Sequence, residues 1–164
     1  MSGNHRKLVP LLVAAVAAAL TFLTAGPAVA APAHSLSRAG ATARSAAAVL
    51  PARLRAFYWA RTQYGKPYLY GGTGPAGYDC SGLVMEAYLH AGIRLPRTTS
   101  EMLSSPELVR VTRPAKGDLA FYGTGHVELY AHGDWTFGAH ASGQIIGWIK
   151  FGPRWHPTAY YRIR

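Results

Sequence analysis

The spacing of hydrophobic residues predicts helices in the first half of a compact domain and strands in the second half. Over residues 52–64 the apolar positions recur at helical spacing, while arginines occupy the remaining positions. This spacing is typical of an amphipathic helix that packs on a core. Gly65 follows directly, and glycine is common just beyond the end of a helix.

A second helix is predicted over residues 81–91, behind a loop. Residues 66–78 are rich in glycine and proline, which interrupt regular structure. Asp79 then provides a favourable N-cap, and Gly92 provides a C-terminal stop. A further short helix is expected over residues 98–103.

From residue 108 onward the pattern changes to short runs of β-branched and aromatic residues. These runs are separated by Gly, Pro or Asp, and they predict strands at residues 108–111, 118–122, 126–131, 135–140, 144–151 and 158–163. Helices followed by an antiparallel sheet place the chain in the α+β class.

One pair of these strands has a register that the sequence predicts. Residues 132–134 form a candidate hairpin turn centred on Gly133. Symmetric pairing about this glycine sets Ala131 opposite Trp135, Tyr130 opposite Thr136, and His126 opposite His140. Directly opposed side chains lie on the same face of a sheet. We therefore expect the two imidazoles to be close enough for one to hydrogen-bond the other.

The first 30 residues have the pattern of a secretory signal peptide. Arg6 and Lys7 precede an apolar run over residues 8–22, and small residues end at Ala30, where cleavage is expected. The alternative is a retained membrane anchor. It is less favoured because the apolar run is short for a membrane span and contains a proline. We therefore expect a secreted protein without stable membrane insertion.

Residues 31–50 are rich in Ala, Ser and Arg and are expected to form a flexible lead-in to a single domain over residues 51–164. After the signal, 15 of the 17 Lys and Arg remain against 7 Asp and Glu, a formal charge of +8. A basic surface suits nucleic acid or the anionic polymers of a bacterial cell wall. Export favours the wall, and the scattered basic residues disfavour a nucleic-acid-binding arm. A monomer is expected.

Cys80 is the single cysteine of the chain, so it has no internal disulfide partner. At the first turn of the predicted helix, the N-terminal dipole favours the thiolate form. A thiolate nucleophile also needs an imidazole partner, a group that orients the imidazole, and donors for an oxyanion. His126 is the candidate partner and His140 the candidate orienting group. The backbone N–H of Cys80 and the Tyr68 hydroxyl are the candidate oxyanion donors.

Each of these residues has another possible role. A lone cysteine in a helix is often a small buried hydrophobic residue, and a single histidine in a strand is often incidental. A zinc site built from Cys80, His126, His132 and His140 is disfavoured. No two of these residues have the short spacing typical of zinc modules, and the chain has no second cysteine. No metal or cofactor is expected.

The order of the motifs resembles that of the NlpC/P60 cell-wall peptidases, a papain-like group. The segments that carry the resemblance are residues 68–72 (YLYGG), 79–84 (DCSGLV), 92–98 (GIRLPRT), 117–121 (GDLAF), 125–130 (GHVELY) and 138–140 (GAH). Together they cover nearly all of residues 51–164. The resemblance implies a papain-like α+β fold in which helices pack on an antiparallel sheet.

The resemblance also implies a function and a set of site residues. Members of the family hydrolyse peptidoglycan stem peptides, commonly between D-γ-glutamyl and a diamino acid, through a thioester intermediate. The implied triad is Cys80, His126 and His140, with Tyr68 beside the thiol to position or stabilise the reacting group. In relatives, the residues that correspond to Asp79 and Ser81 contact the amine of the substrate or line its groove.

Four positions depart from the pattern of the family. They are Tyr70, where tryptophan is frequent, Met102 in place of glutamine, Lys116 in place of proline, and Glu128 in place of glycine. We expect Met102 and Glu128 to alter the substrate groove and none of the four to touch the triad.

Two other functions remain open at this point. The same machinery serves an N-acetylmuramoyl-L-alanine amidase or an acyl transferase. A non-catalytic cell-wall-binding domain would also suit the high positive charge, although it would leave the candidate triad without a purpose.

Overall fold

The computed structural model describes residues 50–164, where helices come first and strands follow. The helices are α2 (Ala52–Arg61), α3 (Cys80–His90) and α4 (Thr99–Leu103). The strands are β1 (Leu108–Val111), β2 (Leu119–Tyr122), β3 (His126–His132), β4 (Trp135–Gly138), β5 (Gly147–Lys150) and β6 (Ala159–Ile163). The predicted signal at residues 1–30 and the lead-in up to residue 49 lie outside the described residues.

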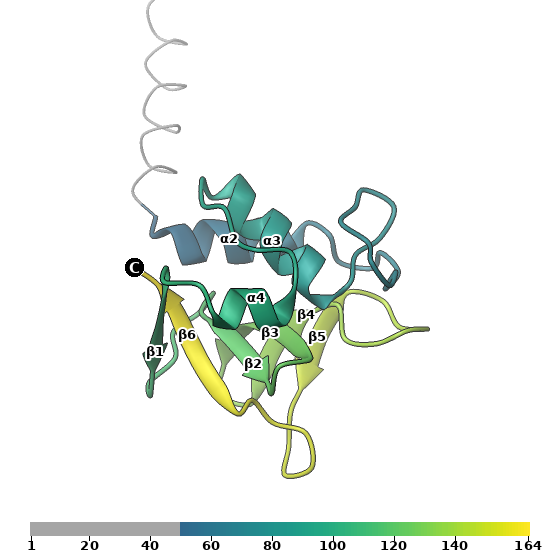
Figure 1. Cartoon of the computed structure of the whole chain (residues 1–164). Coiled ribbons are helices and arrows are strands. Elements are labelled where there is room, and N and C mark those ends of the chain that lie inside the picture. Colours follow the sequence, from purple (N-terminus) through teal and green to yellow (C-terminus); the bar gives the residue numbers. More distant parts are fainter. Residues whose placement is uncertain (1–49) are drawn as a thin grey trace, which may run out of the picture. The chain divides into compact units, whose positions relative to one another are not determined.

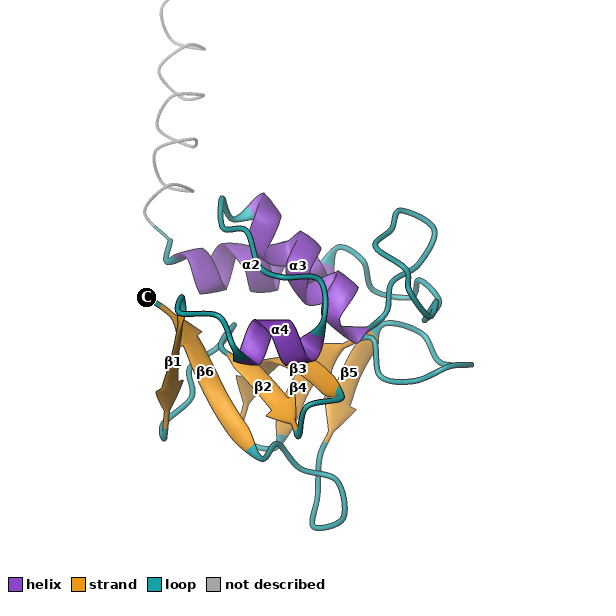
Figure 2. Cartoon of the chain, viewed as in Figure 1, coloured by secondary structure: helices purple, strands orange, loops and turns teal. Residues whose placement is uncertain are grey.

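The six strands form one antiparallel sheet in the order β1-β6-β2-β3-β4-β5. Figures 1 and 2 show the three helices together on one side of this sheet. Helix α3 packs against both α2 and β3. This arrangement confirms the predicted α+β class.

The core lies between the helices and the sheet. Phe57 of α2, Leu83 of α3, and Phe121 and Phe137 of the sheet are fully buried in it. Burying a side chain of this size contributes about 1.5–3 kcal/mol. The hydrophobic pattern that predicted the elements therefore also packs α3, which begins at Cys80, against β3.

The start of α3 is held by its cap and by the loop before it. A side-chain oxygen of Asp79 accepts a hydrogen bond of 2.7 Å from the backbone N–H of Gly82, as predicted for an N-cap. The loop carbonyl of Gly72 accepts a bond of 3.0 Å from the N–H of Asp79. A Cβ atom on Gly82 would lie 2.1 Å from this carbonyl oxygen. Glycine at position 82 therefore lets the loop approach the helix.

The β3–β4 hairpin departs from the predicted register only next to its turn. Tyr130 pairs with Thr136 as expected, but a bulge follows, and His132 rather than Ala131 lies opposite Trp135. A bulge inserts one extra residue and disrupts the ladder locally. Away from the turn the predicted register is kept, because Leu129 pairs with Phe137 in continuation of the Tyr130–Thr136 pair. Strand β4 ends at Gly138, so His140 lies beyond the ladder and the predicted pair of His126 with His140 is not among its backbone pairs.

Within residues 50–164, the helices are all too short or too polar to cross a membrane.

Candidate active site

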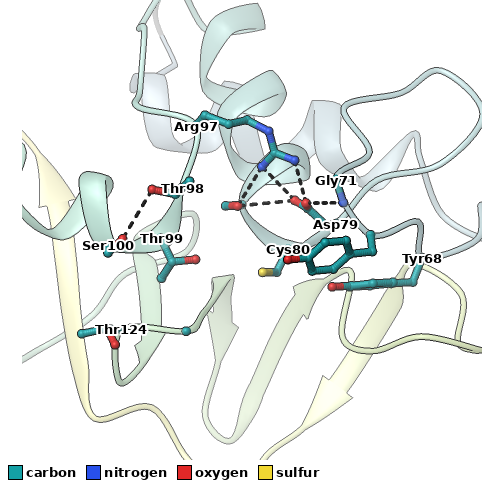
Figure 3. A pocket seen from close by; sticks show the side chains of 12 residues that line it. Tyr68, Gly71, Asp79, Cys80, Arg97, Thr98, Thr99, Ser100 and Thr124 are labelled. Carbon is teal, nitrogen blue, oxygen red and sulfur yellow. Dashed lines mark hydrogen bonds and ion pairs between the residues drawn. The ribbon is translucent and has the colours of Figure 1, made fainter.

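Cys80 is the first residue of α3 and lies on the wall of an open surface pocket of about 470 Å³. Figure 3 shows this pocket with Cys80 and Tyr68 on one wall and the side chain of Thr124 across from them. The lining residues come from the loop before α3, the start of α3, the segment before and within α4, and the turn between β2 and β3. The thiol is thus placed at the meeting point of the helical layer and the sheet.

The thiol has His126 as its partner. Burial raises the pKa of Cys80, but the hydrogen bond and the positive charge of His126 outweigh this effect and lower the pKa below its ordinary value. His126 is the first residue of β3 and is itself buried. Burial lowers its pKa, whereas hydrogen bonds to Cys80 and Glu128 raise it to about 9. Both pKa shifts act in the direction that favours a thiolate–imidazolium pair.

Glu128 provides the group that holds His126. Its Oε1 atom lies 2.9 Å from Nε2 of His126 and 2.9 Å from Nδ1 of His140. The Glu128 side chain is fully buried. Because alternate residues of a strand point to the same face, His126 and Glu128 project together from β3. With Nε2 engaged by the carboxylate, the other ring nitrogen, Nδ1, is left for the thiol.

Two further donors fix the second oxygen of the Glu128 carboxylate. The hydroxyl of Tyr122 donates to Oε2 over 3.0 Å, and the hydroxyl of Thr136 donates to the same atom. Burial raises the pKa of Glu128. Hydrogen bonds from His126 and His140, with the positive charge of His126, outweigh burial and lower this pKa below its ordinary value. The carboxylate is thus ionised and locked between donors from three strands and the segment after β4.

This arrangement corrects the predicted role of His140. The sequence suggested that His140 hydrogen-bonds His126 directly, but both rings instead bond the same carboxylate oxygen. Their centroids lie 5.5 Å apart, edge to face. The expectation that Glu128 does not touch the triad was also wrong. His140 holds the carboxylate, and the carboxylate holds His126.

An aromatic pair covers the two imidazoles. Trp155 stacks on Tyr122 with centroids 4.6 Å apart, and its ring lies 5.6 Å from His126 and 5.4 Å from His140. Trp155 is 43% exposed, whereas Tyr122 is buried. The indole therefore shields the histidines from water on one side and strengthens the electrostatic interactions beneath it.

Asp79 and Ser81 lie in the pocket but already have partners. Arg97 donates to both carboxylate oxygens of Asp79, over 3.0 and 2.6 Å, and to the Ser81 hydroxyl over 3.0 Å. The backbone N–H of Gly71 also donates to Asp79, over 2.9 Å. Figure 3 shows this cluster above the thiol. A carboxylate only accepts hydrogen bonds, so Asp79 shapes the pocket rather than stabilising an oxyanion.

Tyr68 lies on the same wall as Cys80, in agreement with its predicted place beside the thiol. Burial and the neighbouring charges of Cys80 and Asp79 raise the pKa of Tyr68 above its ordinary value. Its hydroxyl therefore keeps its proton at neutral pH and remains a hydrogen-bond donor.

Three residues that contact the candidate site residues were not identified from the sequence. They are Glu128, Arg97 and Trp155. For Glu128 a signal existed, because an acid two residues after the candidate base occupies the same strand face. Met102 showed the opposite error, since it is fully buried in the core and does not line the pocket.

His126, Glu128 and His140 also offer ligand atoms within 4.8 Å of one another, a spacing that a metal ion could use. Each of these atoms already has a hydrogen-bond partner inside the trio. The arrangement is therefore explained without an ion. The rejected zinc set differs from this trio, because it included Cys80 and His132 instead of Glu128.

Comparisons with known proteins agree with the fold. A family model described as "NlpC/P60 family" matches residues 65–159. The Bacillus subtilis (strain 168) protein named bifunctional muramidase/DL-endopeptidase CwlT is 35% identical over 109 residues. The match covers 61% of this chain and 33% of CwlT, so the chain spans about a third of the length of that relative.

Two solved structures from Mycobacterium tuberculosis are similar over most of the domain. RipB, described as a peptidoglycan hydrolase, has a TM-score of 0.61 and 24% identity, over 83% of this chain and 94% of RipB. RipD has a TM-score of 0.57 and 27% identity, over 70% of this chain and 98% of RipD. RipD is described as a non-catalytic NlpC/p60 domain protein adapted to peptidoglycan binding. The expected papain-like NlpC/P60 fold is confirmed.

Proposed function

This chain belongs to the NlpC/P60 family, and we propose that it is a secreted peptidoglycan hydrolase that cleaves stem peptides with Cys80 as its nucleophile. The observation that carries this proposal is the connected series Cys80, His126 and Glu128 at the edge of an open pocket. His126 lowers the pKa of Cys80, and Cys80 and Glu128 raise the pKa of His126, which are the directions that thiol catalysis needs. The name of CwlT, a DL-endopeptidase, supports the same reaction class.

In the first half of the reaction, the Cys80 thiolate attacks the carbonyl carbon of the scissile amide. The carbonyl oxygen becomes an oxyanion, which the backbone N–H of Cys80 and the Tyr68 hydroxyl stabilise. The first N–H groups of a helix have no partner within the helix, so this donor is free for the task. His126 then gives its Nδ1 proton to the departing amine, and a thioester remains on Cys80.

In the second half, neutral His126 removes a proton from a water molecule that attacks the thioester carbonyl. The acyl group leaves as a carboxylic acid, and the sulfur leaves as a thiolate. His126 is again an imidazolium, so the starting ion pair is restored. Throughout both steps Glu128 keeps the ring oriented and stabilises its positive charge.

We assign the bond between D-γ-glutamyl and a diamino acid as the target. Support comes from the resemblance of the motifs and from the DL-endopeptidase in the name of CwlT. The signal-like first 30 residues and the excess of 17 Lys and Arg over 7 Asp and Glu fit an enzyme that works on an anionic wall. Attachment through such charges weakens as salt is added.

Mass spectrometry of purified muropeptides, digested by the wild type and by Cys80→Ala, tests this function. The wild type is expected to release peptides that begin at the diamino acid, and the alanine variant to release none. Equal cleavage by both proteins would overturn the mechanism. Release of whole stem peptides from the glycan would instead identify an N-acetylmuramoyl-L-alanine amidase, and transfer of the acyl group to an added amine would identify an acyl transferase.

The similarity to RipD favours one further candidate, a peptidoglycan-binding domain without catalysis. Such a domain has no need for an imidazolium paired with a thiolate. The pKa of His126, raised to about 9 beside Cys80, therefore supports the hydrolase. Binding of muropeptides without any cleavage by the wild type would favour the binding domain.

A further inference from the structure

A second groove lies beside the proposed active site and has the chemistry of a carbohydrate site. It has a volume of about 450 Å³, within the range of roughly 300–1,000 Å³ that is usual for small-molecule sites. Tyr64, Ile145 and Trp148 line it and are 60%, 54% and 41% exposed. Large apolar side chains that gather at one exposed place mark binding surfaces.

The Trp148 ring is held firmly in place. It belongs to β5, and its ring contacts Phe137 at 5.3 Å and Phe57 at 6.1 Å between centroids, both of which are core residues. A side chain that is already fixed loses little conformational entropy when it binds a ligand. Trp148 is therefore a preorganised and partly exposed aromatic side chain.

Polar groups surround this side chain. Gln144 lines the groove, and the guanidinium of Arg61 lies 5.3 Å from the centre of the Trp148 ring. The lining residues include no acid. Sugar rings present apolar C–H faces that stack on aromatic rings, and hydroxyl or acetamido groups that bond to amides and guanidinium groups.

The groove adjoins the pocket of Cys80. The backbone N–H of Tyr68 donates to the carbonyl of Gln144 over 2.9 Å, and that of Ile146 donates to Lys66 over 2.8 Å. Tyr68 lines the pocket of Cys80, and Gln144 lines the groove. A two-stranded ladder thus joins the two sites, on the side of the sheet where Figure 1 shows the loop after β4 beside the loop before α3. One branched polymer can occupy both.

We propose that this groove binds the glycan strand of peptidoglycan while the stem peptide lies at Cys80. The inference rests on the proposed function, because it places the two parts of one substrate in two adjoining sites. It assigns Tyr64, Gln144 and Trp148 to the glycan. Saccharide binding at the groove needs neither the thiol nor the histidines, so it is measured separately from cleavage.

Calorimetric titration of the full chain carrying Cys80→Ala with peptide-free strands of alternating N-acetylglucosamine and N-acetylmuramic acid tests the proposal. We expect saturable binding that Tyr64→Ala weakens about tenfold, the effect of losing one aromatic anchor. Trp148→Phe, which keeps a ring in the core, is expected to weaken binding less than Tyr64→Ala. Tyr58→Ala is the matched control, because Tyr58 is an exposed tyrosine of α2 outside the groove.

Kinetics of the protein with Cys80 intact give an independent measurement. Tyr64→Ala is expected to raise KM for glycan-linked stem peptides, whereas Tyr58→Ala, outside the groove, is expected to leave it unchanged. Unaltered glycan affinity in Tyr64→Ala would overturn the proposal. So would competition by free peptide for the groove, or self-association of the chain that Tyr64→Ala abolishes. Failure of the proposed hydrolysis would show differently, as glycan binding by a wild type that cleaves nothing.

Discussion

The Nε2 atom of His126 lies 2.9 Å from the Oε1 atom of Glu128, two positions further along the same strand. A strand places such residues on one face, so a short piece of β3 carries both the proposed base and its carboxylate. Strand β3 is an interior strand, paired on both sides by β2 and β4. The orientation of the imidazole therefore depends on the most constrained part of the sheet.

Replacing Glu128 with glutamine is expected to lower kcat/KM at pH 7 by roughly 10²–10⁴-fold. The amide keeps the size of the side chain but removes the negative charge that stabilises the imidazolium. In the wild type, activity appears as Cys80 loses its proton and disappears as His126 loses its own, near pH 9. Without the carboxylate the pKa of His126 falls, so the alkaline limb of the pH profile moves to lower pH.

The measurement is kcat/KM against pH for wild type and Glu128→Gln on one synthetic stem peptide. Glu107→Gln is the control, because it also replaces a glutamate with glutamine but does so at an exposed site before β1. An alkaline limb that stays in place in Glu128→Gln would contradict the role given to the carboxylate.

The thiol itself is expected to react as a thiolate below the pKa of about 8.5 of an ordinary cysteine. His126 supplies both the hydrogen bond and the charge that lower the pKa of Cys80. In His126→Ala both contributions of His126 are lost, while burial, the largest cause, still raises the pKa of Cys80, so the step should move to higher pH. The rate of alkylation by iodoacetamide across pH measures this, with glutathione as the reference thiol. Identical profiles for the two proteins would refute the ion pair.

Changing His140 to alanine is expected to reduce kcat by about 10- to 100-fold, the size of one charge-assisted hydrogen bond. The loss should be smaller than that from Glu128→Gln, because Tyr122 and Thr136 still donate to the carboxylate. His140→Asn keeps a donor close to the position of Nδ1 and should recover part of the activity. If His140→Ala were as inactive as His126→Ala, His140 would have to act on the reacting groups themselves.

Gly82→Ala is expected to lower the free energy of unfolding by about 1–3 kcal/mol, as overpacking does elsewhere. Its new Cβ would lie 2.1 Å from the carbonyl oxygen of Gly72, although alanine normally favours a helix over glycine. Urea denaturation measures the difference. Gly152→Ala is the control, because a Cβ there meets nothing within 4 Å. Equal stability of both variants would show that the loop does not rest on the helix start.

The sequence predicted the elements of the domain well, because their signals are local. The N-cap at Asp79 is local, and so is the strand at residues 108–111, which matches β1. The helix expected over residues 52–64 ends earlier, at Arg61, and continues as turns. Gly65, which was expected to follow the helix directly, instead ends the turns at residues 62–65.

The hydrogen bonds within the site were harder to predict, because they join segments that are distant in the sequence. The bulge after Tyr130 changed the pairing beside the turn, and no residue type signals it, whereas the pairing of Leu129 and Tyr130 kept the predicted register. The burial of Glu128 follows from four donors that the fold brings together from separate segments. A family pattern with glycine at this position gave no reason to expect a buried acid there.

Cys80 starts a helix and His126 starts a strand, so the sulfur and the ring that activates it come from opposite layers. Only the docked layers bring them together. While the two layers are apart, Cys80 lacks the imidazole that lowers its pKa, so the proposed hydrolysis requires the docked fold. The tertiary structure itself therefore restrains the proposed activity, in addition to any restraint from outside the domain.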